Sequence, residues 1–190
     1  MKIRDSAMPD EAVWRGFFDP DSVLGRLGLT AGCGDVVEFG CGYGTFTIPA
    51  ARITGGTVHA LDIEPQMIEA TWRRAAEAGL CNVRAVLRDF MAHGTGLPDG
   101  SAGYAMVFNI LHGERPVDLL REALRSLRRG GLAAIMHWNH DPATPRGPAM
   151  EIRPRPEQCL GWAREAGFVP AGDGIIDLPP YHYGLTLRRP

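Results

Sequence analysis

Residues 38–44 read Glu38-Phe39-Gly40-Cys41-Gly42-Tyr43-Gly44, directly after the apolar pair Val36-Val37 and before an apolar segment that can begin a helix. A strand that ends in an acid and continues through a glycine turn into a helix is typical of nucleotide sites in open α/β sheets. Gly40 permits a tight turn with positive φ, Gly42 leaves backbone open to a ligand, and Gly44 lets helix and strand approach closely. The unpaired N–H groups of the helix N-terminus would then face the ligand.

The spacing of these glycines separates two kinds of cofactor. The dinucleotide fingerprint G-x-G-x-x-G/A would place its third small residue at Thr45, whereas the additional glycine lies one position earlier, at Gly44. The resulting G-x-G-x-G with a preceding acid resembles the first motif of class I S-adenosylmethionine-dependent methyltransferases. A loop-forming glycine cluster without a ligand is the simpler alternative. The resemblance implies that S-adenosylmethionine contacts the residues Glu38, Gly40, Cys41, Gly42, Tyr43 and Gly44.

Composition indicates an ordinary globular chain with no special partner. The 190 residues suffice for one well-buried domain, with 45% apolar and 22% charged residues and a net charge of -2. The only lysine is Lys2 and the arginines are interspersed with acids, which argues against nucleic-acid binding. Four widely spaced cysteines form no C-x-x-C pair, and neither a signal peptide nor a membrane-spanning run is visible. We therefore predict a cytoplasmic protein that does not bind membranes.

The first thirty residues are expected to form a helical arm before a single catalytic domain of residues 31–190. One short helix should start at Pro9-Asp10-Glu11 and a second at Asp19-Pro20, with Asp19 as its cap. The arm is unusually aromatic, because it carries Trp14, Phe17 and Phe18. These rings either pack on the domain or form part of the wall of an acceptor site.

Strand and helix patterns alternate along the rest of the chain, which indicates a parallel sheet covered by helices on both faces. The expected strands are 35–39, 56–63, 83–87, 105–110, 132–138, 174–178 and 183–188, and the expected helices are 45–53, 65–78, 116–129 and 156–167. The last two strands are too close for a parallel crossover and should be antiparallel. The resemblance implies a Rossmann-like α/β fold with seven strands in the order 3-2-1-4-5-7-6, strand 7 being antiparallel.

Polar residues follow the successive strands where a parallel sheet binds its ligands. Asp62 can accept hydrogen bonds from a ribose diol, although it could instead cap the next helix, and Ile63 would lie against adenine. The resemblance implies that Asp89, followed by Phe90, accepts a bond from the adenine amino group; a surface turn is the alternative. Asn109 offers a donor and an acceptor to the methionine end of the cofactor.

The resemblance implies transfer of a methyl group to an acceptor, with the reactive chemistry carried by the cofactor. Asn109-Ile110-Leu111-His112 stands in place of the Asp/Asn-Pro-Pro-Tyr of adenine- and glutamine-methylating enzymes, which argues against methylation of adenine. The segment resembles that of the small-molecule methyltransferases of the quinone-biosynthesis and related groups, which implies a small-molecule acceptor. His137 and His112 are the candidate bases if the acceptor must lose a proton, although a single histidine is more often structural.

Other readings of the same residues stay open. A metal site from His137, His140 and Asp141 lacks the usual spacing, so none is expected. The proline-rich residues 141–156 could be a lid whose Arg146, Arg153 and Arg155 meet an acidic substrate, or a solvated loop. The alternatives in function are an NAD(P)-dependent oxidoreductase and a non-catalytic S-adenosylmethionine-binding protein. The oligomeric state is not predicted.

Overall fold

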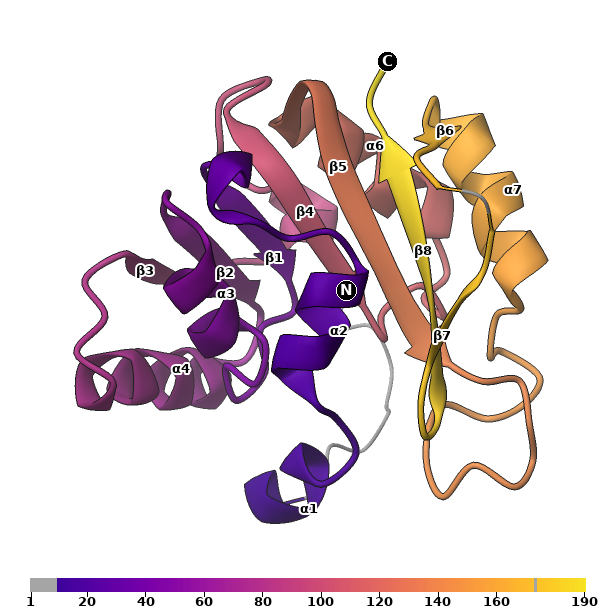
Figure 1. Ribbon diagram of the computed structural model, residues 1–190, viewed down its shortest axis with the longest axis horizontal. Helices are drawn as coiled ribbons and strands as arrows, with labels where there is room; N and C mark the ends of the chain where they lie inside the picture. The colour runs from indigo at the N-terminus through magenta and orange to yellow at the C-terminus, as the bar shows by residue number, and fades with distance from the viewer. Residues whose placement is uncertain (1–9, 173) are drawn as a thin grey trace.

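The computed structural model describes residues 10–172 and 174–190, which form one mixed sheet with helices on both faces (Figure 1). The strands are β1 (Val36–Phe39), β2 (Val58–Asp62), β3 (Val83–Leu87), β4 (Ala102–Phe108), β5 (Leu127–Trp138), β6 (Val169–Pro170), β7 (Ile176–Leu178) and β8 (His182–Arg188). The helices are α1 (Glu11–Arg15), α2 (Pro20–Arg26), α3 (Thr47–Ile53), α4 (Pro65–Glu77), α5 (Phe90–His93), α6 (Pro116–Ser126) and α7 (Pro156–Ala166), with a 3-10 turn η1 (Ala31–Cys33).

The sheet order confirms the predicted fold. Its strands run β3-β2-β1-β4-β5-β8-β6, with β7 also paired to β8. Strands β1 to β5 are parallel, and β8 is antiparallel to β5. The predicted sixth strand, 174–178, is present as β7, whereas β6 was not predicted and pairs with the other end of β8. The order therefore reverses beside β1 and β4, where open sheets bind their ligands.

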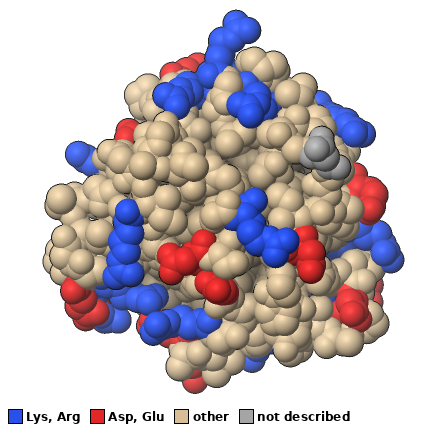
Figure 2. Space-filling view, in the orientation of Figure 1, with Lys and Arg blue, Asp and Glu red and all other residues tan. Residues whose placement is uncertain are grey.

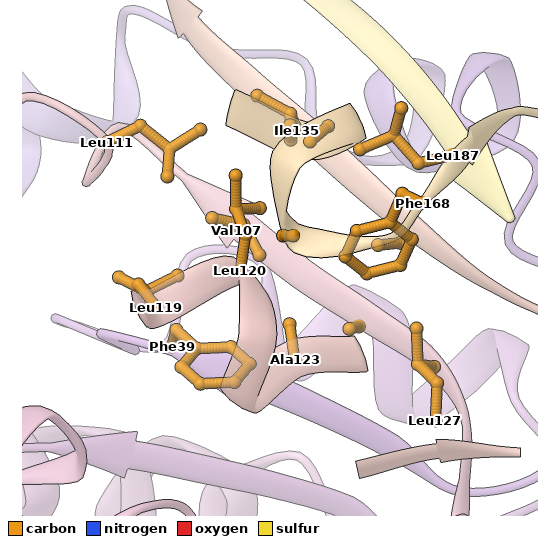
Figure 3. Close-up of a cluster of buried hydrophobic side chains, with 14 of the residues drawn as sticks. Phe39, Val107, Leu111, Leu119, Leu120, Ala123, Leu127, Ile135, Phe168 and Leu187 are labelled. Carbon is orange, nitrogen blue, oxygen red and sulfur yellow. The ribbon is translucent and has the colours of Figure 1, made fainter. Parts of the chain in front are cut away.

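Two apolar cores cover the two faces of the sheet. On one face α6 and α7 pack against strand residues that include Val107, Ile135 and Leu187 (Figure 3). On the other face, α2 and α3 cover strand residues that include Met106 and Met136. Alternate residues of β4 and β5 thus enter opposite cores, as expected for strands buried on both faces.

The boundary between α6 and β5 corrects the sequence prediction. The helix was expected to reach Arg129, but it ends at Ser126, and the strand begins at Leu127 instead of residue 132. Arg189 is the physical reason, because its guanidinium donates to the carbonyls of Leu124, Arg125 and Leu127 and so satisfies the helix end. A contact made 60 residues away along the chain is invisible to local propensity.

The N-terminal arm, as far as it is described, is partly built into the domain. Asp19 caps α2 by accepting a bond from the Ser22 N–H at 3.1 Å, as predicted. Val23 and Leu24 of α2 are buried in the core under the sheet face that α3 also covers. The first helix starts at Glu11, while the predicted start at Pro9 lies outside the described residues.

Charges of both signs are interspersed on the face seen in Figure 2, and no patch of a single sign dominates it. This distribution does not resemble the basic stripe that tracks a nucleic-acid backbone. Among residues 10–172 and 174–190, no helix is long and apolar enough to cross a membrane.

Candidate cofactor and acceptor site

The glycine loop leaves β1 with the backbone conformations that its sequence predicts. Gly40, Gly42 and Gly44 have φ values of 80°, 53° and 75°. The amides of Gly40 and Cys41 both donate to the carbonyl of Leu61 at 2.9 Å, which joins the loop to the end of β2. A Cβ on Gly44 would lie 3.0 Å from the Thr71 hydroxyl. The loop is therefore held against β2 and α4 in a left-handed geometry that favours glycine.

Asp62 lies at the end of β2 and fixes this loop. One carboxylate oxygen accepts from the Gly42 N–H at 2.9 Å, and the other accepts from the Glu64 N–H at 3.0 Å. Burial raises the pKa of Asp62, against the lowering effect of these amide bonds. The bond to Gly42 shows that Asp62 orders the loop beside it, a role that its strand-end position alone did not reveal.

Glu38 is almost fully buried at the end of β1, at 3% exposure. The Thr47 hydroxyl donates to its carboxyl group. Burial raises the pKa of Glu38 to about 8, although the bond from Thr47 opposes the shift and nearby Asp62 adds to it. The cofactor end thus holds two acidic groups whose ionisation is costly unless a positive charge approaches.

Helix α4 supports the loop from behind through contacts that sequence reasoning missed. Thr71 donates to the Gly42 carbonyl at 2.9 Å, and the Arg74 guanidinium donates to the Tyr43 carbonyl at 2.8 Å. Arg74 also pairs with Glu11 of the arm at 3.2 Å. Only the helical spacing of Thr71 and Arg74 on one side of α4 could have indicated such contacts in advance.

The residues expected near adenine differ in how they are placed. Asp89 is the N-cap of α5, because its Oδ1 accepts from the amides of Met91 and Ala92. The Phe90 side chain packs edge-on against Phe39, with ring centroids 5.3 Å apart, in the α6–α7 core. Phe90 can therefore meet a ligand only through its backbone, whereas Ile63 remains partly exposed after β2.

Asn109 follows β4 in an unusual backbone conformation, with φ of 53°. Its amide N–H donates to the Met136 carbonyl of β5 at 2.8 Å. Its side-chain Oδ1 is buried and has no hydrogen-bond partner among the described residues, and the Thr45 hydroxyl at the start of α3 is in the same state. Unsatisfied buried polar atoms are rare, and at the end of a parallel strand they lie where such sheets bind their ligands.

The two candidate catalytic histidines lie together. His112 Nδ1 is 3.3 Å from His137 Nε2. His137 is fully buried, and burial, helped by His112, lowers the pKa of His137 well below its ordinary value. His137 is therefore a neutral imidazole inside the protein, while His112 is partly exposed.

The proline-rich segment between β5 and α7 is organised by Arg153. This side chain is only 7% exposed and donates to backbone carbonyls of Asn139, Asp141, Arg146 and Pro148 and to the Thr144 hydroxyl. Its donors are thus occupied by neutral acceptors within the segment. The expectation that Arg153 meets an acidic substrate is replaced by a structural role, which local sequence could not distinguish.

A pocket of about 590 Å³ opens beside this segment, at the edge where β4 and β5 end. It is open to solvent and bordered by the loop after β4, the proline-rich segment and the start of α7. Its lining residues are Leu111, His112, Gly113, Glu114, Pro116, His140, Glu151, Ile152, Arg153, Pro154, Arg155, Gln158 and Trp162. Its size is that of a small-molecule site. His137 is not among its lining residues.

The aromatic residues of the arm form a second cluster on the opposite face of β5. Trp14 lies 6.3 Å from Trp138 and Phe17 lies 5.5 Å from it, while Phe18 lies 4.7 Å from His182, measured between ring centroids. The Nε1 of Trp138 and the Nε2 of His182 are buried without a hydrogen-bond partner among the described residues. This packing places the arm against β5 and the turn before β8.

No group of three or more histidine, cysteine or acidic side chains suited to a metal ion occurs in the described chain from residue 10 onward. The residues at the glycine loop fit S-adenosylmethionine, since they offer a left-handed loop, two buried acids and an Asn109 Oδ1 that has no partner among the described residues. A cationic sulfonium compound matches that set of negative and acceptor groups.

Comparison with known proteins decides the family. A sequence profile of the methyltransferase domain matches residues 36–131, from β1 to the start of β5. The chain belongs to the methyltransferase domain family. This result confirms the expected family.

Individual relatives differ in what they methylate. Aklanonic acid methyltransferase DauC of Streptomyces sp. (strain C5) is 36% identical over 96 residues, which are 50% of this chain and 40% of that protein. A ribosomal protein L11 methyltransferase of Methylococcus capsulatus is 38% identical over 96 residues, 50% of this chain and 30% of that protein. The matched segment thus spans less than half of either relative.

A solved structure resembles this fold along nearly the whole chain. The crystal structure of a SAM-dependent methyltransferase from Aquifex aeolicus superposes with a TM-score of 0.81 at 23% identity, covering 94% of this chain and 93% of that one. At this identity the likeness concerns the fold alone.

Proposed function

We propose that this protein transfers the methyl group of S-adenosylmethionine to a small-molecule acceptor. The observation that carries the proposal is the hydrogen bond from the Gly42 N–H to Asp62, which holds a left-handed glycine loop beside a strand-end carboxylate. The 590 Å³ pocket at the neighbouring strand ends supports a small acceptor. The ribosomal protein L11 methyltransferases among the relatives make a protein acceptor the competing candidate.

Each residue of the cradle has a defined task in this proposal. Asp62 would accept hydrogen bonds from the ribose hydroxyls while keeping the loop in place, and Asn109 Oδ1 would accept from the ammonium group at the methionine end. Asp89 and Ile63 would lie against adenine. Glu38 would contribute negative charge beneath the loop. Bound S-adenosylmethionine supplies an electrophilic methyl carbon, and the protein holds the acceptor in line with it.

Calorimetry tests this proposal directly. The protein should bind S-adenosylmethionine and S-adenosylhomocysteine but not NAD, since the third position of the dinucleotide fingerprint is Thr45. Binding of NAD with no binding of either sulfur compound would sink the proposal. Cofactor binding without methyl transfer to any small acceptor, but with transfer to a ribosomal protein, would redirect it to a protein substrate. The cytoplasmic location remains a prediction from the cysteine spacing.

A further inference from the structure

We propose, on the basis of the methyl transfer above, that the 590 Å³ pocket binds an aromatic hydroxyl compound and that His140 is the base that takes its proton. The pocket lies where the chain leaves β4, the strand next to β1, and β5, the strand on the other side of β4. Figure 1 shows the segment that contains His140 as the orange loop beyond the end of β5. This site differs from the cluster of aromatic residues on the arm side.

The hydrogen bonding of His140 defines its tautomer. His140 Nδ1 is 2.8 Å from the carbonyl oxygen of Arg153. A carbonyl oxygen only accepts hydrogen bonds, so Nδ1 carries the hydrogen in the neutral imidazole. The lone pair is then on Nε2, the nitrogen that a base uses. His140 is partly exposed and lines the pocket, so this nitrogen belongs to a side chain that an acceptor can reach.

The surroundings of His140 are fixed before any ligand binds. The Arg153 guanidinium donates to the Asn139 carbonyl at 3.0 Å and to the Pro148 carbonyl at 2.9 Å, which ties together both ends of the loop. A Cβ on Gly147 would lie 2.8 Å from the same guanidinium, so the loop is closely packed around it. The base is therefore held on a buried scaffold, as efficient proton transfer requires.

His137 does not have this access. It is 0% exposed, and its Nε2 faces His112 at 3.3 Å. It stands behind His112, which lines the pocket, and acts at most as a positioning residue. The sequence could not make this distinction, because His137 and His140 flank the same strand end.

The pocket also indicates the class of acceptor. A carboxylate acceptor is already ionised near neutral pH and needs no base, whereas an aromatic hydroxyl loses its proton as it is methylated. Leu111, Ile152 and Trp162 offer apolar contacts, including an indole ring, for a planar compound. As the new O–C bond forms, the C–S bond breaks and its electron pair stays on sulfur. The O–H bond breaks at the same time, and the proton passes to His140 Nε2.

The first test measures binding of the probe 7-hydroxycoumarin to the protein in the presence of S-adenosylhomocysteine. The fluorescence of the probe reports the binding. Gln158→Trp fills the pocket and should weaken binding at least about tenfold. Gln158→Ala removes the same side-chain bond to the Arg155 N–H without filling the pocket, and Arg164→Trp adds the same bulk to exposed α7 surface. Both controls, and Phe17→Ala on the arm, should stay within about threefold of the unmodified protein.

The outcomes separate this inference from the proposed function. Loss of probe binding in Phe17→Ala but not in Gln158→Trp would place the acceptor on the arm side and overturn the inference. No saturable binding to the unmodified protein would overturn the aromatic hydroxyl class. S-adenosylhomocysteine affinity, measured by calorimetry on the same samples, should be unchanged throughout; its absence in the unmodified protein would instead overturn the proposed function.

The second test concerns His140 itself. Long-range proton–nitrogen NMR spectra should show the Nδ1–H tautomer, and His140→Gln should lower transfer of labelled methyl to 7-hydroxycoumarin at least about 100-fold while probe affinity changes little. His137→Phe should lower transfer less than His140→Gln does. An Nε2–H tautomer for His140, no methyl transfer to the probe by the unmodified protein, or unchanged transfer in His140→Gln would each overturn the assignment of the base.

Discussion

The cofactor loop and the proline-rich segment both bury charge at the same edge of the sheet, but of opposite sign. The loop covers Glu38 and Asp62, whose burial raises the pKa of both. The proline-rich segment covers the Arg153 guanidinium, whose pKa burial lowers. The acids are arranged so that a positively charged ligand would stabilise their ionised forms, whereas the guanidinium is already surrounded by carbonyl oxygens of its own segment.

This difference in how the buried charged groups are hydrogen-bonded distinguishes a binding site from a structural scaffold. Polar groups in a ligand site have atoms without a hydrogen-bond partner in the protein, as the buried Asn109 Oδ1 has among the described residues beside the loop. Groups that organise a segment use their capacity within it, as Arg153 does. The predictions below test whether the two regions are independent and whether their buried charges have these separate roles.

The largest effect is expected at Glu38. Its pKa is about 8 in the folded protein and 4.5 ordinarily, so the stability it contributes is present below pH 4.5 and is lost as pH rises through 8. Glu38→Gln cannot ionise and avoids this loss. Relative to the unmodified protein, it should gain on the order of 3–5 kcal/mol between pH 4.5 and pH 8.

Urea unfolding at several pH values without cofactor measures this gain. Glu69→Gln, at an exposed position on α4, provides a control that should show no comparable trend. Equal pH dependence in Glu38→Gln and the unmodified protein would mean that Glu38 is ionised in the folded state, and the proposed contrast with Arg153 would be lost.

Arg153→Met should give the next largest effect. Loss of the guanidinium leaves several buried carbonyls without donors, which should lower the local stability of the proline-rich segment by about 2–4 kcal/mol. Hydrogen exchange should show the segment opening, while S-adenosylhomocysteine affinity stays unchanged because the cofactor loop shares none of these bonds. Arg146→Met, at an exposed arginine of the same segment, serves as the control. Loss of cofactor affinity in Arg153→Met would show that the two regions are coupled.

Asp62→Ala should weaken S-adenosylmethionine binding by about 1.5–3 kcal/mol, since it removes a charged acceptor from the ribose and the acceptor of the Gly42 N–H. Asp62→Asn keeps the shape and one acceptor oxygen and should lose less. Calorimetry measures both affinities. An Asp62→Ala protein that binds as tightly as the unmodified one would show that the loop needs no support from β2 and that ribose is bound elsewhere.

The same comparison explains what could be predicted from the sequence. The positive φ of Gly40 and the place of Asp62 at the end of β2 could be predicted from the local sequence, whereas the bond from Gly42 to Asp62 could not. Their contacts with a cofactor stay predictions. The parallel sheet with a final antiparallel pair could be predicted from the alternating patterns and the short last connection, and the strand order from the family resemblance. These features depend on neighbours in sequence or on the general geometry of parallel sheets.

The remaining features depend on single long-range contacts. Arg189 ends α6, Arg74 supports Tyr43, and Arg153 organises the segment around His140. Each is one arginine among many, and nothing in its neighbourhood along the chain marks which carbonyl it will meet. Local propensity therefore misplaced the end of α6, and neither alternative weighed for Arg153, a contact with an acidic substrate or a solvated loop, included its role inside the segment.

Replacing Asp89 should have the smallest effect on cofactor affinity of these substitutions. It therefore tests how Asp62, which holds the glycine loop, differs from Asp89, whose carboxylate also caps α5. Its Oδ1 already accepts from the amides of Met91 and Ala92, so a bond to adenine would share this carboxylate with the cap of α5. Asp89→Ala should weaken S-adenosylmethionine binding by about 0.5–1 kcal/mol and lower stability by about 1 kcal/mol through loss of the α5 cap. Asp89→Asn keeps a capping oxygen and should restore most of the stability without restoring the carboxylate, so calorimetry and urea unfolding together separate the two roles. A larger loss of affinity in Asp89→Ala than in Asp62→Ala would mean that adenine, and not ribose, carries most of the recognition.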